Sequence, residues 1–88
     1  MSTVGMDIQA VRTLAKLLAA KADEIESIAN SLSSKLHSVD WKGHDADQFR
    51  DAWNSGHRSQ LMHVASSLRD TSNVANRNAS DQEQVSSR

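Results

Sequence analysis

Five large apolar residues recur every seven positions through the first half of a chain that has 88 residues and no proline. This row consists of Val11, Leu18, Ile25, Leu32 and Val39. A strict seven-residue repeat is typical of a helix that packs lengthwise against a partner with slight left-handed supercoiling. The spacing therefore predicts a helix over about residues 8–39, roughly 45–50 Å long at 1.5 Å per residue.

Two further rows flank this one. Leu14 and Ile28 occupy the d positions of the same heptads, where Lys21 and Lys35 interrupt the row. A lysine can lay its methylene groups along such a row and keep its ammonium group in water. The neighbouring e row reads Ile8, Ala15, Ala22, Ala29 and Leu36. Because alanines permit close approach of a second helix, we expect a wide stripe that needs partners along its length.

Both ends of this predicted helix carry local signals. Asp7 can cap the first turn by accepting from a free backbone N–H, so residues 1–6 are expected to form a flexible N-terminus. At the other end lies a turn predicted over residues 40–45. There Gly43 can adopt a left-handed conformation that closes the helix, next to Trp41.

A second helix is predicted over about residues 46–75. Asp45 and Gln48 have the spacing of a capping box at its start. Since the turn is short, the two helices must run antiparallel. Gly56 lies on the same side as Trp53 and is expected to admit a neighbouring backbone or a bulky side chain. Residues 76–88 contain one large apolar residue, Val85, and are predicted to form a disordered tail.

These elements predict an all-α fold in which residues 7–75 form an antiparallel helical hairpin. Two helices alone cannot bury a stripe three rows wide, so we expect two hairpins to dimerise into a four-helix bundle. The hairpin and dimer core is expected to comprise Val11, Leu14, Leu18, Ile25, Ile28, Leu32, Leu36, Val39, Trp53, Gly56, Val64 and Leu68.

Composition argues against several functional classes. Ten basic and eleven acidic residues are interspersed, so no basic stripe suits nucleic acid. There is no cysteine, and the four histidines lack the spacing that places two metal ligands on one helical face. We therefore expect no enzyme, no metal and no cofactor. The longest uninterrupted apolar run, residues 17–20, is too short for membrane insertion, and no signal peptide is recognisable.

Trp41 permits two interpretations. A tryptophan at the end of a hairpin can plug the core, as Trp53 is expected to do in the middle. It can equally be an exposed anchor for another protein, because tryptophan combines a large apolar surface with a polar N–H. Folding alone does not decide between a plug and an anchor.

The Trp41-Lys42-Gly43 turn between two proline-free helices resembles the WXG family of small type VII (ESX) secretion substrates, the early-secreted-antigen-like proteins of actinobacteria and other Gram-positive bacteria. Ala46 and Phe49 fall on the small and aromatic positions usually seen just after the motif, and the resemblance covers nearly the whole chain. It implies a hairpin that dimerises with itself or with a sibling. It also implies export of the folded dimer by an ATPase-driven machine without a cleavable signal peptide, to act as an effector or an export partner.

One departure from the family pattern is the absence of tyrosine. Many exported members carry a Tyr-x-x-x-Asp/Glu signal after the second helix, whereas residues 75–79 here have alanines at the corresponding ends. We therefore hypothesise that a sibling supplies this signal. The expected partner in export is the secretion ATPase, contacted directly or through the sibling's C-terminal signal. The alternative is an intracellular helical adaptor or chaperone that docks another protein and is not itself secreted.

Overall fold

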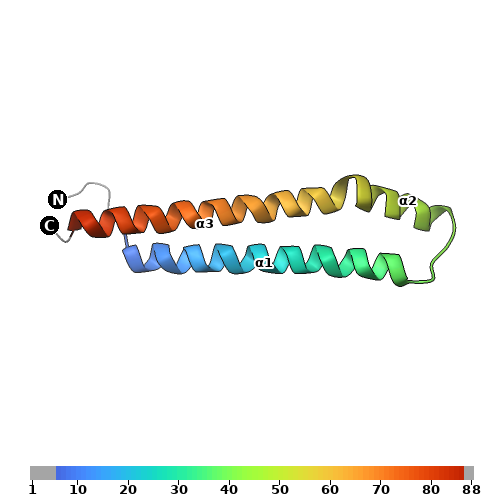
Figure 1. Cartoon of the computed structure of the whole chain (residues 1–88), viewed down its shortest axis with the longest axis horizontal. Coiled ribbons are helices and arrows are strands. Elements are labelled where there is room, and N and C mark those ends of the chain that lie inside the picture. Colours follow the sequence, from blue (N-terminus) through green and yellow to red (C-terminus); the bar gives the residue numbers. More distant parts are fainter. Residues whose placement is uncertain (1–5, 87–88) are drawn as a thin grey trace.

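The computed structural model describes residues 6–86, and all of its regular elements are helical. In chain order they are α1 (Ile8–Ser38), α2 (His44–Ala52), the π-helical turn η1 (Trp53–His57) and α3 (Arg58–Ser86). The last three follow one another without a break, and α3 returns alongside α1 (Figure 1). The molecule is a rod of 66 × 17 × 13 Å. The prediction of an all-α fold is confirmed for the described residues.

The start of α1 follows from a local cap. The Asp7 carboxylate accepts from the backbone N–H of Ala10 at 3.0 Å, which satisfies one of the free donors of the first turn. The prediction that Asp7 caps a helix beginning at Ile8 is confirmed. At the far end, Val39 leaves the helix in an extended conformation with ψ of 140°.

The two long helices meet along small residues. Ala15, Ala22 and Ala29 of α1 are fully buried, and the opposing row on α3 also has heptad spacing. That row consists of Ala65, Ser72 and Ala79. Small side chains let the two backbones approach closely, and the Ser72 hydroxyl donates to the carbonyl oxygen of Ala15 at 2.7 Å. We call these six residues the seam.

The predicted end of the second helix near residue 75 is wrong. Helix α3 continues to Ser86, so residues 76–86 are not a disordered tail. The physical reason is that Ala79 extends the seam by one further heptad and Glu83 pairs with Arg12 of α1 at 3.0 Å. Residues 1–5, predicted to be flexible, and residues 87–88, predicted to belong to the disordered tail, lie outside the described residues.

The start of the second helix also differs from the prediction. Helix α1 ends at Ser38, so Gly43 does not close it. Gly43, which has a positive φ of 117°, instead lies directly before α2. The carbonyl oxygen of Gly43 accepts the first helical bond, from the N–H of Asp47 at 3.0 Å. The helix therefore begins at His44, and Asp45 lies inside its first turn rather than capping it.

Sequence spacing did not predict the π-helical turn. It interrupts what was expected to be one continuous helix, and Figure 1 shows the ribbon bulging there. Gly56 lies within this turn, but a Cβ built on it would meet no atom within 4 Å. Nothing within the described chain occupies the space beside Gly56, so the expectation that it admits a backbone or a bulky side chain stays a prediction for a partner.

Candidate functional site: the hairpin tip and its open face

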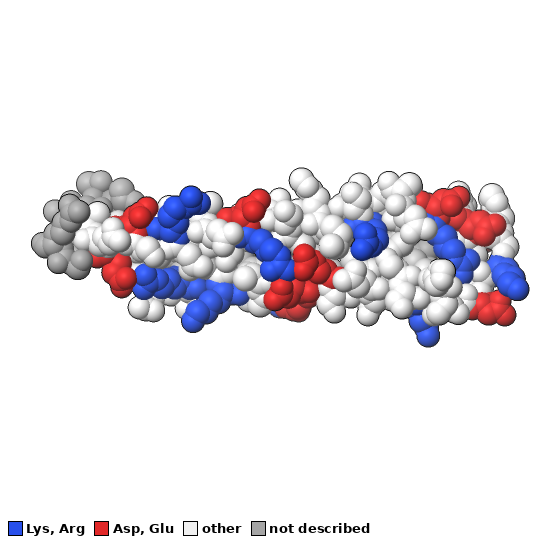
Figure 2. Space-filling model, viewed as in Figure 1, with Lys and Arg blue, Asp and Glu red and all other residues white. Residues whose placement is uncertain are grey.

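Ion pairs join the helices on one flank of the seam. The Arg12 guanidinium binds both carboxylate oxygens of Glu83, at 3.0 and 3.3 Å. Arg69 reaches back across the helices to Asp23 at 2.6 Å and to Glu26. Basic and acidic side chains are interspersed on the face shown in Figure 2, and neither sign forms a continuous stripe. We call this flank the ion-paired face.

The positions of these charged residues relative to the seam show which residues lie on the opposite flank. Arg12 and Glu26 each lie three positions before a seam alanine, and Arg69 lies three positions before Ser72. On both helices, therefore, residues three positions before the seam share one face. Residues four positions and one position before the seam lie on the other flank of each helix.

This other flank is apolar and uncovered, and we call it the open face. Its α1 residues include Leu14 and Ile28, which are 49% and 53% exposed. Leu61, Val64 and Leu68 continue it on α3. Apolar side chains this exposed along one side of a rod are typical of an interaction surface.

The residues predicted for the hairpin and dimer core divide into three groups. Trp53 is buried. Six are half-buried, namely Val11, Leu18, Ile25, Leu36, Gly56 and Leu68. Five are exposed, namely Leu14, Ile28, Leu32, Val39 and Val64. The reason is that the alanine row, not the row of large residues, faces the second helix within one hairpin. The large residues border the seam on the open face.

Arg50 organises the tip of the hairpin. Its guanidinium donates to the carbonyl oxygens of Leu36, Val39 and Trp41 at 3.0, 3.3 and 2.7 Å. These carbonyls belong to the last turn of α1 and to the loop, beyond the regular helical hydrogen bonds, and that of Val39 also accepts from the Trp41 N–H at 3.1 Å. One side chain of α2 thus fixes the path of the loop, and a charged donor strengthens each bond.

Trp41 is held but not covered. Its ring lies 5.9 Å from the Arg50 guanidinium carbon and 6.5 Å from the ring centre of Phe49, at distances typical of cation–π and tilted aromatic contacts. The residue nevertheless remains 42% exposed. Ala46, expected beside the motif, is fully buried and Phe49 is exposed. Trp41 therefore presents a fixed aromatic surface at the end of the rod.

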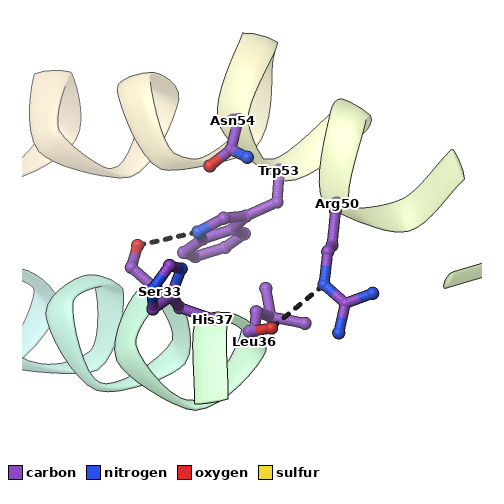
Figure 3. A pocket seen from close by; sticks show the side chains of 6 residues that line it. All are labelled: Ser33, Leu36, His37, Arg50, Trp53 and Asn54. Atoms are coloured by element: carbon purple, nitrogen blue, oxygen red, sulfur yellow. Dashed lines mark hydrogen bonds between the residues drawn. The ribbon is translucent and has the colours of Figure 1, made fainter. Parts of the chain in front are cut away.

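Trp53 fills the space between α1 and η1, where it is 4% exposed. Its indole N–H donates to the Ser33 hydroxyl at 2.8 Å, and the ring points from η1 toward α1 (Figure 3). Beside it lies a pocket of about 190 Å³, lined also by Leu36, His37, Arg50 and Asn54. The Arg50 guanidinium that lines this pocket is already engaged by three carbonyl oxygens.

Ion pairing shifts pKa values on the ion-paired face. Hydrogen bonding by Arg12, and then its positive charge, lower the pKa of Glu83 below the usual value. The hydrogen bonds that Arg69 donates to Asp23 and Glu26 raise its already high pKa. Among the described residues no three His, Cys, Asp or Glu side chains gather as a metal site. Within the same residues, no helix combines the length and apolarity needed to cross a membrane.

Two features of the site were not predicted from the sequence. Arg50 was not predicted, because its acceptors lie up to 14 positions away along the chain and no local pattern expresses such a contact. The seam residues of α3 were not predicted, because small side chains do not stand out among the large apolar residues of that helix. Their seven-residue spacing, which matches that of the alanines in α1, would have revealed them.

The chain matches no protein-family model, and no curated protein or solved structure shows significant similarity to it.

Proposed function

We propose that this chain is a small WXG-type protein, exported by a type VII (ESX) secretion system as a folded dimer. It acts there as an effector or export partner through protein–protein contacts. The observation that carries this proposal is Trp41, which is 42% exposed yet fixed at the tip by Arg50 and Phe49. A tryptophan serving only as a plug would be covered, whereas an exposed and preorganised one suits recognition.

The open face supports the dimeric part of the proposal. The two larger dimensions of the rod, 66 and 17 Å, give this face a projected area of roughly 1,100 Å². A stable interface needs about 800 Å² from each partner. A second hairpin laid lengthwise on this face would complete a four-helix bundle, supplied either by the same chain or by a WXG-family sibling.

Export is proposed to depend on the tip together with a partner. The tyrosine-containing signal of the family is absent here, so the sibling's C-terminus would engage the secretion ATPase while Trp41 and Gly43 complete the recognised surface. The protein would be made in the cytoplasm and released folded, without a cleavable signal peptide. No role with nucleic acid and no insertion into a membrane is proposed.

Export can be tested in a type VII-competent host that expresses the untagged chain with its neighbouring small helical genes. The chain is expected in the culture supernatant, and its release should stop when the secretion ATPase is inactivated. Protein found only in the cells under both conditions would contradict the proposal and favour the intracellular adaptor.

The tip is tested with Trp41→Ala. The variant should keep its helicity and its dimer yet lose export. Val74→Ala provides a matched control, because Val74 is 43% exposed on α3 and far along the chain from the tip. If Trp41→Ala lowers stability and leaves export of the remaining folded protein unchanged, Trp41 is a structural plug.

A further inference from the structure

The returning arm of the hairpin contacts α1 in two different ways. Along α3 the contact is made by small seam residues such as Ala65 and Ser72, and among the described helices close backbone approach to α1 is almost confined to α3. Toward the tip the contact is made by long side chains, because Trp53 of η1 and Arg50 of α2 reach across to α1 (Figure 3). The two backbones are therefore closely packed at the seam and bridged by large side chains near the tip.

These two parts of the arm do not share one α-helical register. Trp53 and Ala65 both face α1 and are buried, and they lie 12 positions apart. Three turns of an α-helix take about 11 residues, so a continuous α-helix that begins with Trp53 would turn Val64 toward α1. Val64 is instead 46% exposed. The chain thus has one residue in excess between the two contacts.

The π-helical turn accommodates this residue. At its end the Arg58 N–H donates to the carbonyl oxygen of Trp53, five positions earlier, whereas an α-helical N–H donates to the residue four positions earlier. Within the turn the Ser55 hydroxyl donates at 2.6 Å to the carbonyl oxygen of Asp51, the acceptor that the Ser55 N–H would use in an α-helix. By holding one extra residue, η1 lets Trp53 and the seam face α1 at the same time.

We propose that η1 is a hinge, at which the tip segment (residues 44–53, which are α2 and Trp53) swings away from α1 while the seam stays closed. Helices bend sharply at π-helical turns, because the regular series of hydrogen bonds is interrupted there. The non-helical residues 39–43 provide the second joint, on the other side of the tip segment. This inference goes beyond the proposed function and does not depend on it.

The closed state is held by contacts that the swing would break. Trp53 donates to the Ser33 hydroxyl at 2.8 Å, and Arg50 donates to the carbonyl oxygen of Leu36 at 3.0 Å. Opening breaks both bonds and moves the Trp53 ring, which is 4% exposed when closed, into water. The seam contacts lie beyond η1 and stay intact. The indole N–H of Trp53 therefore reports the opening of the tip segment.

Hydrogen exchange of the wild-type chain, followed by NMR, tests the hinge directly. The Trp53 indole N–H and the backbone amides of α2 are expected to open together, with protection factors at least about tenfold lower than those of the seam amides in α3. The step in protection should fall within η1. Equal protection of α2 and α3, or a Trp53 indole that exchanges only on global unfolding, would overturn the proposal.

Deletion of Ser55 tests whether the extra residue makes the hinge. The shortened arm can form a continuous α-helix in which Trp53 and Ala65 still face α1, so the melting temperature should stay within about 5 °C of the wild-type value. With the hinge removed, the protection factor of the Trp53 indole N–H should rise at least about tenfold.

Deletion of Ser66 is the matched control, because this serine is also exposed but lies within α3, directly after Ala65. Its loss turns every later seam residue by about 100°, and the melting temperature should fall by more than about 10 °C. Equal losses in the two deletions would show that Ser55 fills no excess position, which contradicts the proposal. A stable chain without Ser55 whose Trp53 exchanges as in the wild type would contradict the hinge as well.

Both measurements use the purified chain and are separate from export in culture. A chain that opens at η1 but stays inside the cell contradicts the secretion proposal alone. An exported chain with uniform protection along α2 and α3 contradicts the hinge alone.

Discussion

At the scale of single residues, the tip depends on one side chain. Arg50 satisfies three carbonyl oxygens of the loop and of the end of α1, and it also lies against Trp41. We expect Arg50→Gln to lower the free energy of unfolding by about 2 kcal/mol, because three carbonyl oxygens, that of Leu36 part-buried, lose a charged donor. Urea denaturation followed by circular dichroism measures this.

Arg58→Gln is the control for that measurement. Arg58 makes a single long contact with Asn30, at 3.4 Å, so its loss should change stability by less than about 0.5 kcal/mol. In Arg50→Gln, release of the loop should also change the fluorescence of the exposed Trp41. Equal stability losses in the two variants would show that Arg50 does not hold the tip.

At the scale of elements, the seam determines how closely α1 and α3 approach. Ala22 is fully buried there, whereas Ala20 on the same helix is exposed. Ala22→Leu should destabilise the hairpin by about 1–3 kcal/mol, because the added atoms force the backbones apart. Ala20→Leu should be nearly neutral in the same denaturation experiment. Tolerance of leucine at position 22 would contradict a tightly packed seam.

The last turns of α3 are held by a pair whose strength depends on pH. Because the pKa of Glu83 is lower in the folded protein than its usual value of about 4.5, the stabilisation is fully present above that value. It is lost as pH falls through the lowered pKa. An NMR titration of the Glu83 carboxyl should show the lowered pKa in the wild type and a return toward the usual value in Arg12→Gln. An unchanged pKa in that variant would exclude the pair.

The helices also show which structural features local sequence signals predict and which depend on contacts between helices. Local signals were sufficient for the start of α1, where Asp7 caps the first turn, and for the all-α class. They failed for the end of α3, because what keeps residues 76–86 helical is contact with α1, which propensity and apolar content do not express. The same holds for Arg50, whose acceptors lie up to 14 positions away along the chain.

At the scale of the whole molecule, a rod with one apolar side has a preferred way to associate. Two rods packed lengthwise keep nearly the same length, whereas two rods joined through their tips become almost twice as long. The radius of gyration of a rod is set mainly by its length, and the single hairpin has a value of 19.5 Å. Shape and mass together therefore report which surface is covered.

We expect small-angle X-ray scattering of the paired chain to give twice the mass with a radius of gyration still near 19.5 Å. Lengthwise pairing covers the open face, where the exposed large apolar residues include Leu14, Ile28, Leu32, Val64 and Val85, whereas the tip offers little beyond Trp41 and Phe49. A radius that rises steeply as the mass doubles would contradict this arrangement. It would show that the tip is the assembly surface and that the open face remains uncovered.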